Sequence, residues 1–153
     1  MKKIIFALAA FFVISLASNA QDYSTGIGVR AGLSNGLTVK HFINSSDAIE
    51  GLVSSRWSGF NITGLYEFHS RAFNTPRLNW YYGAGGHIGS WKGSRDSDRD
   101  NYTFLGIDGI IGIEYNIEAI PFNISLDWKP TLNILGETEF LADELAISFR
   151  YIF

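Results

Sequence analysis

The sequence contains no cysteine, only one methionine and only three prolines. Without cysteine the chain has no disulfide bonds, no thiolate chemistry and no lipid attached to an N-terminal cysteine. Basic residues do not outnumber acidic ones, because 12 Lys and Arg stand against 15 Asp and Glu. This balance argues against nucleic acid as a partner. Beyond the N-terminal apolar run, no stretch is long enough to cross a membrane as a helix.

The N-terminal segment has the three parts of a secretory signal peptide. Met1-Lys-Lys3 is a short basic start, an apolar run follows from Ile4 to Ala17, and Ser18-Asn-Ala20 is a small-residue cleavage site. The apolar run is too short to span a bilayer as a helix, although an uncleaved N-terminal anchor is the alternative interpretation. We expect residues 1–20 to be removed, which leaves residues 21–153 as one domain.

Glycine and aromatic residues are abundant, with 16 glycines and an aromatic content of 15%. Apolar residues make up 46% of the chain and are spread over short runs in which polar and apolar side chains alternate. The last ten residues show this alternation most clearly, with Ile152 as the one exception. Their apolar set is Leu145, Ile147, Phe149, Tyr151 and Phe153. Such alternation is typical of a strand with two unlike faces, so the sequence predicts an all-β protein.

The alternating pattern predicts eight strands separated by turn residues. They span roughly residues 24–33, 36–43, 48–55, 58–70, 78–91, 102–115, 121–132 and 143–153. Ser34-Asn35-Gly36 is the strongest hairpin turn, because Asn-Gly accepts the positive φ angles that such turns need. Further connections are expected at residues 44–47, 71–77, 92–101, 116–121 and 133–142. No helical periodicity, internal repeat or linker interrupts the mature chain.

Alternation alone leaves open which face of the strands lies inside a barrel. A soluble lipocalin-like barrel has its apolar set inside, whereas a membrane barrel has it outside. One set of alternate positions consists of glycines with isolated charges, which suits a narrow interior better than a solvated surface. Examples are Gly28 with Arg30, His87 with Gly89, and Asp108 with Glu114. The opposite set includes Leu105, Ile107, Ile111 and Ile113, an aliphatic band of the kind that faces lipid.

Aromatic residues are expected to form two rims around this aliphatic band. If both termini are periplasmic, one rim comprises Tyr66, Phe68, Trp80, Tyr82, Tyr115, Phe122, Tyr151 and Phe153. The other rim comprises Trp57, Phe60, Trp91, Tyr102, Phe104 and Trp128. Amphipathic rings gather at the two headgroup layers of a bilayer, and a soluble barrel has no reason for this arrangement. The pattern therefore favours a membrane barrel.

The C-terminus adds a specific resemblance. Phe153 ends the chain, with Tyr151 and Phe149 two and four residues before it, and this pattern resembles the C-terminal assembly signal of bacterial outer-membrane barrels. The mature chain as a whole resembles the small barrels of the type of the OmpA transmembrane domain and OmpX. Segments such as Trp80 to His87 and Asp127-Trp-Lys-Pro130 also resemble a family of uncharacterised secreted barrel proteins.

This resemblance implies an eight-stranded antiparallel up-and-down transmembrane β-barrel in the outer membrane. It further implies a monomer that contacts outer-membrane lipid and the outer-membrane assembly machinery. Eight strands enclose a lumen that side chains fill, so a wide diffusion pore is not expected.

Charged residues at the inward positions must pair inside such a barrel, because an unpaired buried charge is unfavourable by several kcal/mol. The cations are Arg30, Lys40, Lys129 and Arg150, and the acids are Glu50, Glu67, Asp108, Glu114, Asp127 and Glu144. We expect Lys40 to pair with Glu50 across the second hairpin. We expect Arg150 to face inward and to pair with a nearby acid such as Glu144 or Glu114. The favoured interpretation is a structural network that rigidifies the barrel, and the alternative is a gated ion path or proton relay.

No catalytic, cofactor or metal site is predicted. Outer-membrane lipid A deacylases use a His-x-Ser pattern, but Ser70 directly follows His69 and so lies on the opposite strand face. His41 is the third histidine considered as a ligand or base, and His87 and Ser90 also have the wrong parity. The acidic run from Arg95 to Asp100 resembles the start of a calcium loop, yet the glycine and the closing glutamate of such a loop are missing. The chain is therefore not expected to be an enzyme.

The expected role is structural, or an interaction with an unidentified surface ligand through the loops at residues 92–101 and 133–142. Two other function classes remain open at this point. A small channel would reveal itself by conductance in planar bilayers, and a lipid-modifying enzyme by the loss of a lipid A acyl chain.

Overall fold

The computed structural model describes residues 23–56, 59–91, 102–136 and 138–153. Within these ranges the chain forms antiparallel strands and no helix long and apolar enough to span a membrane. The strands are β1 (Thr25–Gly32), β2 (Asn35–Phe42), β3 (Asp47–Arg56), β4 (Gly59–Arg71), β5 (Leu78–Trp91), β6 (Tyr102–Asn116), β7 (Phe122–Trp128), β8 (Thr131–Leu135), β9 (Phe140–Leu141) and β10 (Leu145–Ile152).

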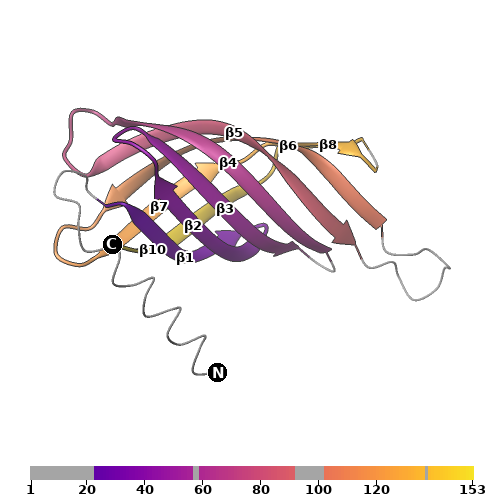
Figure 1. Ribbon diagram of the computed structural model, residues 1–153, viewed down its shortest axis with the longest axis horizontal. Coiled ribbons are helices and arrows are strands. Elements are labelled where there is room, and N and C mark those ends of the chain that lie inside the picture. The colour runs from indigo at the N-terminus through magenta and orange to yellow at the C-terminus, as the bar shows by residue number, and fades with distance from the viewer. Residues whose placement is uncertain (1–22, 57–58, 92–101, 137) are drawn as a thin grey trace, which may run out of the picture.

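Neighbouring strands pair all the way round a closed barrel (Figure 1). Each strand from β1 to β6 pairs with the next along the chain, and β1 pairs with β10 to close the ring. β7 and β8 follow one another along β6 and act as a single strand position, and β10 and β9 lie beside them in turn. The result is the predicted eight-stranded antiparallel up-and-down barrel, so the predicted fold class is confirmed.

The predicted seventh strand, residues 121–132, is interrupted at Lys129 and Pro130. Proline has no N–H group to donate to a strand ladder, which explains the break. The ladder contacts persist around it, because Gly109 N donates to Pro130 O at 2.9 Å and Lys129 N donates to Glu144 O at 2.8 Å. The break therefore leaves the barrel closed.

Two turn predictions were wrong in detail. β1 ends at Gly32 and β2 begins at Asn35, so the first hairpin turns at Leu33 and Ser34 instead of at Asn-Gly. Gly36 lies within β2, where an added Cβ would sit 2.7 Å from Ser54 Cα and still closer to Val53 O, so this glycine serves close strand approach. The expected loop 133–142 is partly strand, because β8 and β9 form a short hairpin there that contains Gly136 at φ 101°.

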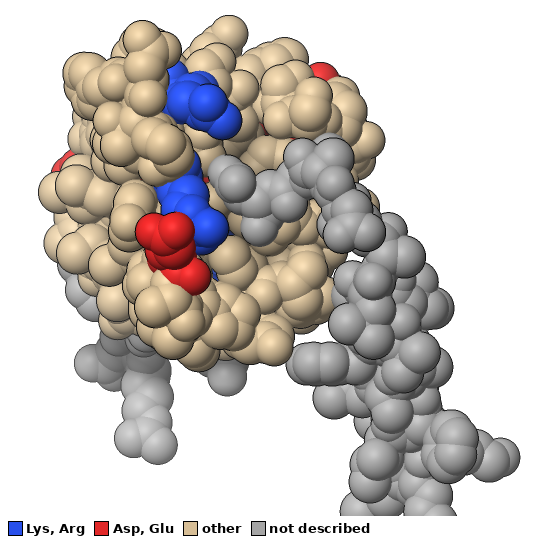
Figure 2. All heavy atoms as spheres, turned by 90° about the vertical axis from the view of Figure 1, so that its left-hand side faces the viewer, with Lys and Arg blue, Asp and Glu red and all other residues tan. Residues whose placement is uncertain are grey.

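The two faces of the wall differ in polarity. Along β10 the side chains alternate between exposed Leu145, Ile147, Phe149 and Tyr151 and buried Ala146, Ser148, Arg150 and Ile152. Many of the largest fully buried side chains are polar or charged, whereas the exposed set is rich in Ile, Leu, Val and aromatic residues. Figure 2 looks onto the C-terminal end of the barrel, where charged side chains occupy a narrow area and the rest of the described surface in view is almost uncharged. The barrel is polar inside and apolar outside.

Two residues of the predicted aromatic rims lie on the wrong face. Trp91 shares the inward parity of His87 and Gly89 and lines a cavity at the end of the barrel away from the C-terminus. Phe104 is buried inside the barrel, and its ring centroid lies 5.6 Å from that of His87. Its position has the same parity as Gly106 and Asp108, and Gly89 opposite it leaves room for the ring. Trp57 and the Tyr102 side chain lie outside the described residues. Most of the other rim residues are exposed on the outer wall.

Candidate functional site: the charged interior

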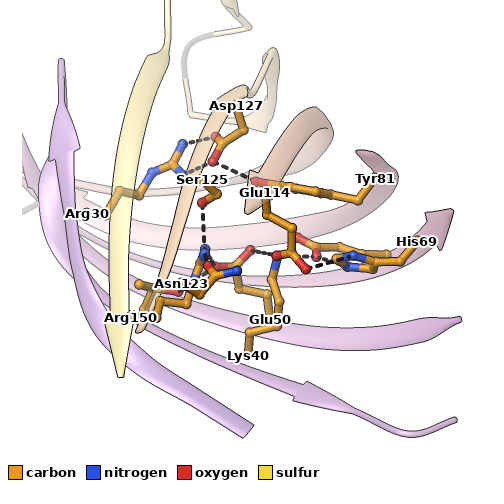
Figure 3. Close-up of polar contacts among 12 residues, drawn as sticks. Arg30, Lys40, Glu50, His69, Tyr81, Glu114, Asn123, Ser125, Asp127 and Arg150 are labelled. Carbon is orange, nitrogen blue, oxygen red and sulfur yellow. Dashed lines mark hydrogen bonds and ion pairs between the residues drawn. The ribbon is translucent and has the colours of Figure 1, made fainter. Parts of the chain in front are cut away.

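The ten predicted interior charges come together in two clusters inside the barrel. All are buried except Glu144, whose side chain is 12% exposed. The terminus-side cluster, toward the end of the barrel that carries the C-terminus, comprises Lys40, Glu50, Glu67, Glu114 and Arg150. The mouth-side cluster, toward the opposite end, comprises Arg30, Asp108, Asp127, Lys129 and Glu144. Figure 3 shows side chains from both clusters pointing toward one another across the interior.

Arg150 is the most fully engaged cation of the terminus-side cluster. Its guanidinium pairs with Glu50 and donates to Thr38 Oγ1 at 3.0 Å, Asn123 Oδ1 at 3.1 Å and Ser125 Oγ at 2.8 Å. These partners stand on β2, β3 and β7. The group thus ties together strands on both sides of β10.

Arg150 pairs with an acid as predicted, but the two acids named as examples, Glu144 and Glu114, are not its direct partners. Glu144 lies six positions away on the same side of the barrel wall, about 20 Å along an extended strand. Gly28 stands opposite Arg150 on β1 and has no side chain, so the guanidinium can pass over β1 to Thr38 and Glu50 beyond it. Glu114 instead faces Lys40 and His69.

Lys40 sits among three carboxylates. Its Nζ lies 2.8 Å from Glu67, 3.5 Å from Glu114 and 3.7 Å from Glu50, and 3.9 Å from the centroid of the Tyr81 ring. The expected contact with Glu50 is present, but Glu67 is the nearer partner. Lys40 therefore interacts with all three carboxylates, and not mainly with Glu50, its neighbour across the hairpin.

His69 completes this cluster. Its Nε2 lies 3.0 Å from Glu67 and its Nδ1 lies 3.4 Å from Glu114, and its ring stacks on Tyr81 with centroids 5.0 Å apart. The Tyr23 hydroxyl donates to Glu114 at 3.2 Å. The histidine is thus held between two acids on β4 and β6.

The mouth-side cluster is built around two cation–carboxylate pairs. Arg30 makes a two-pronged contact with Asp127, at 2.6 and 2.8 Å, a geometry that suits the planar guanidinium. Lys129 bridges Asp108 at 3.0 Å and Glu144 at 3.1 Å. Glu144 also accepts a hydrogen bond of 2.6 Å from the Ser34 hydroxyl.

His87 completes the mouth-side cluster as His69 completes the other. Its Nδ1 lies 2.8 Å from Asp108 and its Nε2 lies 2.8 Å from Asn133 Oδ1. The Thr131 hydroxyl donates to the second oxygen of Asp108 at 2.8 Å. Tyr81 connects the two clusters, because its hydroxyl donates to Asp127 at 3.0 Å while its ring covers Lys40.

The two clusters have the same charge composition. Each holds two permanent cations, three carboxylates and one histidine that contacts a carboxylate. One additional proton in each cluster, on the histidine or on a carboxylate, therefore gives zero net charge. Sequence reasoning missed His69, His87 and Tyr81 as network members. Their signal was parity, because His69 shares the inward face with Glu67 and His87 shares it with Tyr81.

The described residues offer no group of three or more His, Asp or Glu side chains that could hold a metal ion. His69 is buried while Ser70 is exposed, so these neighbours lie on opposite faces of β4. The acidic run from Arg95 to Asp100 lies outside the described residues. The three C-terminal aromatics stand on the outer wall, with Phe149 and Tyr151 exposed and Phe153 partly exposed.

Comparison with models of known protein families gives no match, and comparison with curated proteins gives no significant sequence relative. Among solved structures, the chain is similar to the N-terminal β-barrel domain of Pseudomonas aeruginosa OprF. The TM-score is 0.63 and the sequence identity is 13%, over 83% of this chain and 95% of the OprF domain. The two proteins share the closed eight-stranded barrel fold. At this level of identity the likeness concerns the fold alone.

Proposed function

We propose that this protein is a small outer-membrane β-barrel with a structural or surface-interaction role. The observation that carries the proposal is the inverted wall, in which isoleucines, leucines and aromatic rings face outward while ion pairs lie inside. If this barrel were soluble, its outer wall would expose a large contiguous apolar surface to water, which is unfavourable. In a bilayer the same surface faces hydrocarbon, and closure of the barrel pairs its long strands on both edges.

The interior supports a structural network in preference to a wide pore. Arg150, Lys40 and Glu50 are fully buried and contact partners on strands across the barrel, so side chains occupy the space between opposite walls. Buried charges in this setting remain favourable only with their partners in place. The network therefore links strands across the interior and holds them in one arrangement.

The same geometry supports a non-enzymatic role. His69 and His87 contact carboxylates and an amide, and no described serine is hydrogen-bonded to either ring. An assay for a lost lipid A acyl chain, and a conductance measurement in planar bilayers, test the enzyme and channel alternatives directly. Release of an acyl chain or stable single-channel steps would replace this proposal.

The membrane location can be tested at the C-terminus. Phe153 contributes its ring and its backbone. Its backbone N donates to Thr25 O at 2.9 Å, and its backbone O accepts from Thr25 N at 2.9 Å and from Ser24 N at 3.1 Å. Deletion of Phe153 removes these three hydrogen bonds and the ring, whereas Phe153→Ala removes only the ring. Both variants should lower the yield in the outer-membrane fraction if the ring serves the assembly machinery.

Refolding into detergent separates the two contributions. Phe153→Ala should fold there like the unmodified chain, while the deletion should fold less completely because the β1–β10 closure loses hydrogen bonds. Ile152→Ala serves as a matched control, since it shortens a buried side chain next to the terminus. Undiminished outer-membrane assembly of both Phe153 variants, or a folded chain in the soluble periplasmic fraction, would contradict the proposal.

A further inference from the structure

A cavity of about 310 Å³ opens at the end of the barrel away from the C-terminus. Its wall is built by residues from six strands and their connections, including Asn61, Trp91, Phe104, Glu139 and Glu144. His87 and Thr131 also line it, and both contact Asp108 of the mouth-side cluster. The cavity therefore ends on the charged interior, and neither the structural role nor the membrane location accounts for its chemistry.

The described lining of this cavity combines carboxylates with hydroxyl, amide, imidazole and indole groups. Two carboxylates line it, from Glu139 and Glu144, and no Lys or Arg is among the described residues of the lining. Glu144 forms ion pairs with Lys129 at 3.1 Å and with Arg30 at 3.8 Å, and neither cation lines the cavity. Glu139 is exposed and has no ion pair with any described residue. Among the described residues, the carboxylate of Glu139 is therefore the one in the lining without a cationic partner.

A further acceptor in the lining has no partner. The Oδ1 atom of Asn61 is buried and accepts no hydrogen bond within the described structure. A buried acceptor without a donor is unfavourable, and a ligand N–H group would satisfy it. A ligand that donates a hydrogen bond would therefore satisfy this acceptor.

Aromatic rings make up much of the apolar lining. Trp91 and Phe104 are partly or fully shielded from solvent and line the cavity together. The face of an indole or phenyl ring attracts a cation, and this attraction strengthens where water is excluded. Carboxylates, a free amide oxygen and aromatic faces around one small space are complementary to a positively charged donor with an alkyl body.

We propose that the mouth cavity binds a small organic cation of the alkylammonium class. The ammonium group donates to Glu139 and to Asn61 Oδ1, and the alkyl chain lies against Trp91 and Phe104. This inference goes beyond the structural role and does not depend on it, because binding can be measured on the isolated barrel in detergent.

Butylammonium is a suitable probe, with 1-butanol as the uncharged and butyrate as the anionic comparison. The barrel is refolded in a maltoside detergent, whose headgroup carries no ammonium that could compete. Backbone amide chemical shifts report the site. We expect saturable shifts at Thr131, Asn133 and Leu141 with butylammonium only, and none at Arg71 or Glu118 at the opposite end.

Glu139→Gln is the decisive variant, because it removes the charge of an exposed side chain that no described contact requires. It should raise the dissociation constant of butylammonium about tenfold, the loss typical of a charge-assisted hydrogen bond. Glu118→Gln makes the same change at the opposite end, where the side chain is also exposed, and should have no effect. Equal shifts with 1-butanol, shifts spread over the whole barrel, or unchanged affinity in Glu139→Gln would each overturn the proposal.

Discussion

The terminus-side and mouth-side clusters have the same charges but different surroundings. Arg150 and Glu50 in the first are fully buried, and each carboxylate there meets cations or donors from other strands. Glu144 in the second is partly exposed, and it lines a cavity that is open at one end. The comparison teaches that pairing alone does not set the importance of an interior charge. Access to water decides how much is lost when the partner is removed.

The largest effect is expected at Arg150. Arg150→Leu leaves Glu50 buried without its guanidinium partner, so the free energy of unfolding should fall by about 3–5 kcal/mol. Urea unfolding in detergent or lipid vesicles measures this. Adding Glu50→Gln to the variant should restore part of the loss, because the isolated charge is then gone.

Ser148→Ala is the matched control on the same strand face. Ser148 is fully buried, and its hydroxyl has no hydrogen-bond partner in the described structure. The substitution should therefore change stability by less than about 0.5 kcal/mol. If Arg150→Leu and Ser148→Ala lowered the free energy of unfolding equally, the terminus-side cluster would not be what holds these strands together.

Two glycines allow a similar comparison between the inner and the outer face of the barrel wall. An added Cβ at Gly85 would lie 2.8 Å from Leu65 Cα and closer still to the carbonyl oxygen of Gly64, whereas a Cβ at Gly64 meets nothing within 4 Å. Gly85→Ala should lower stability by about 1–3 kcal/mol, as overpacking of a rigid wall does. Gly64→Ala should be nearly neutral. Equal unfolding curves for the two variants would show that the interior tolerates extra volume.

A smaller effect is expected from the mouth-side cation Lys129. After Lys129→Met, Asp108 keeps its contacts with His87 and Thr131, and Glu144 can be hydrated from the open end. The stability loss should therefore be about 1–2 kcal/mol, clearly below that of Arg150→Leu under the same conditions. A loss as large as that of Arg150→Leu would mean that water does not reach this cluster.

The smallest effect is expected in the connection between β5 and β6, at residues 92–101, which lies outside the described residues. The strands that flank it end and begin at the mouth, so we predict that an epitope inserted between Ser97 and Asp98 is displayed on intact cells. Unfolding should be unchanged, because no described strand pairing includes these residues. Protease added to the cells should cut first at Arg95 or Arg99. Detection of the epitope only in broken cells would show that the barrel has the opposite orientation in the membrane.

Much of the fold was predictable because a strand repeats its face every two residues. This local period identified the polar set around Arg30 and Asp108 and the apolar set around Ile107, and the structure has them on opposite faces. The same rule places Phe104 and Trp91 on the inward face, against their predicted positions in the aromatic rims. The hairpin at Asn35-Gly36 was wrong because glycine has two uses, and here close strand approach decided.

The sequence by itself determined the approximate positions of the main strands, most of their inward and outward faces and the residue types of the interior. The tertiary structure alone decided which charges pair, because partners come from positions far apart in the chain. Arg150 and Glu50 are 100 residues apart, and Gly28 on the strand between them clears the path from one to the other. The mouth cavity likewise exists only once Asn61, Phe104 and Glu139 are brought to the same end. Alternation is a property of each strand, whereas pairing and cavities depend on how closure of the barrel aligns all of them.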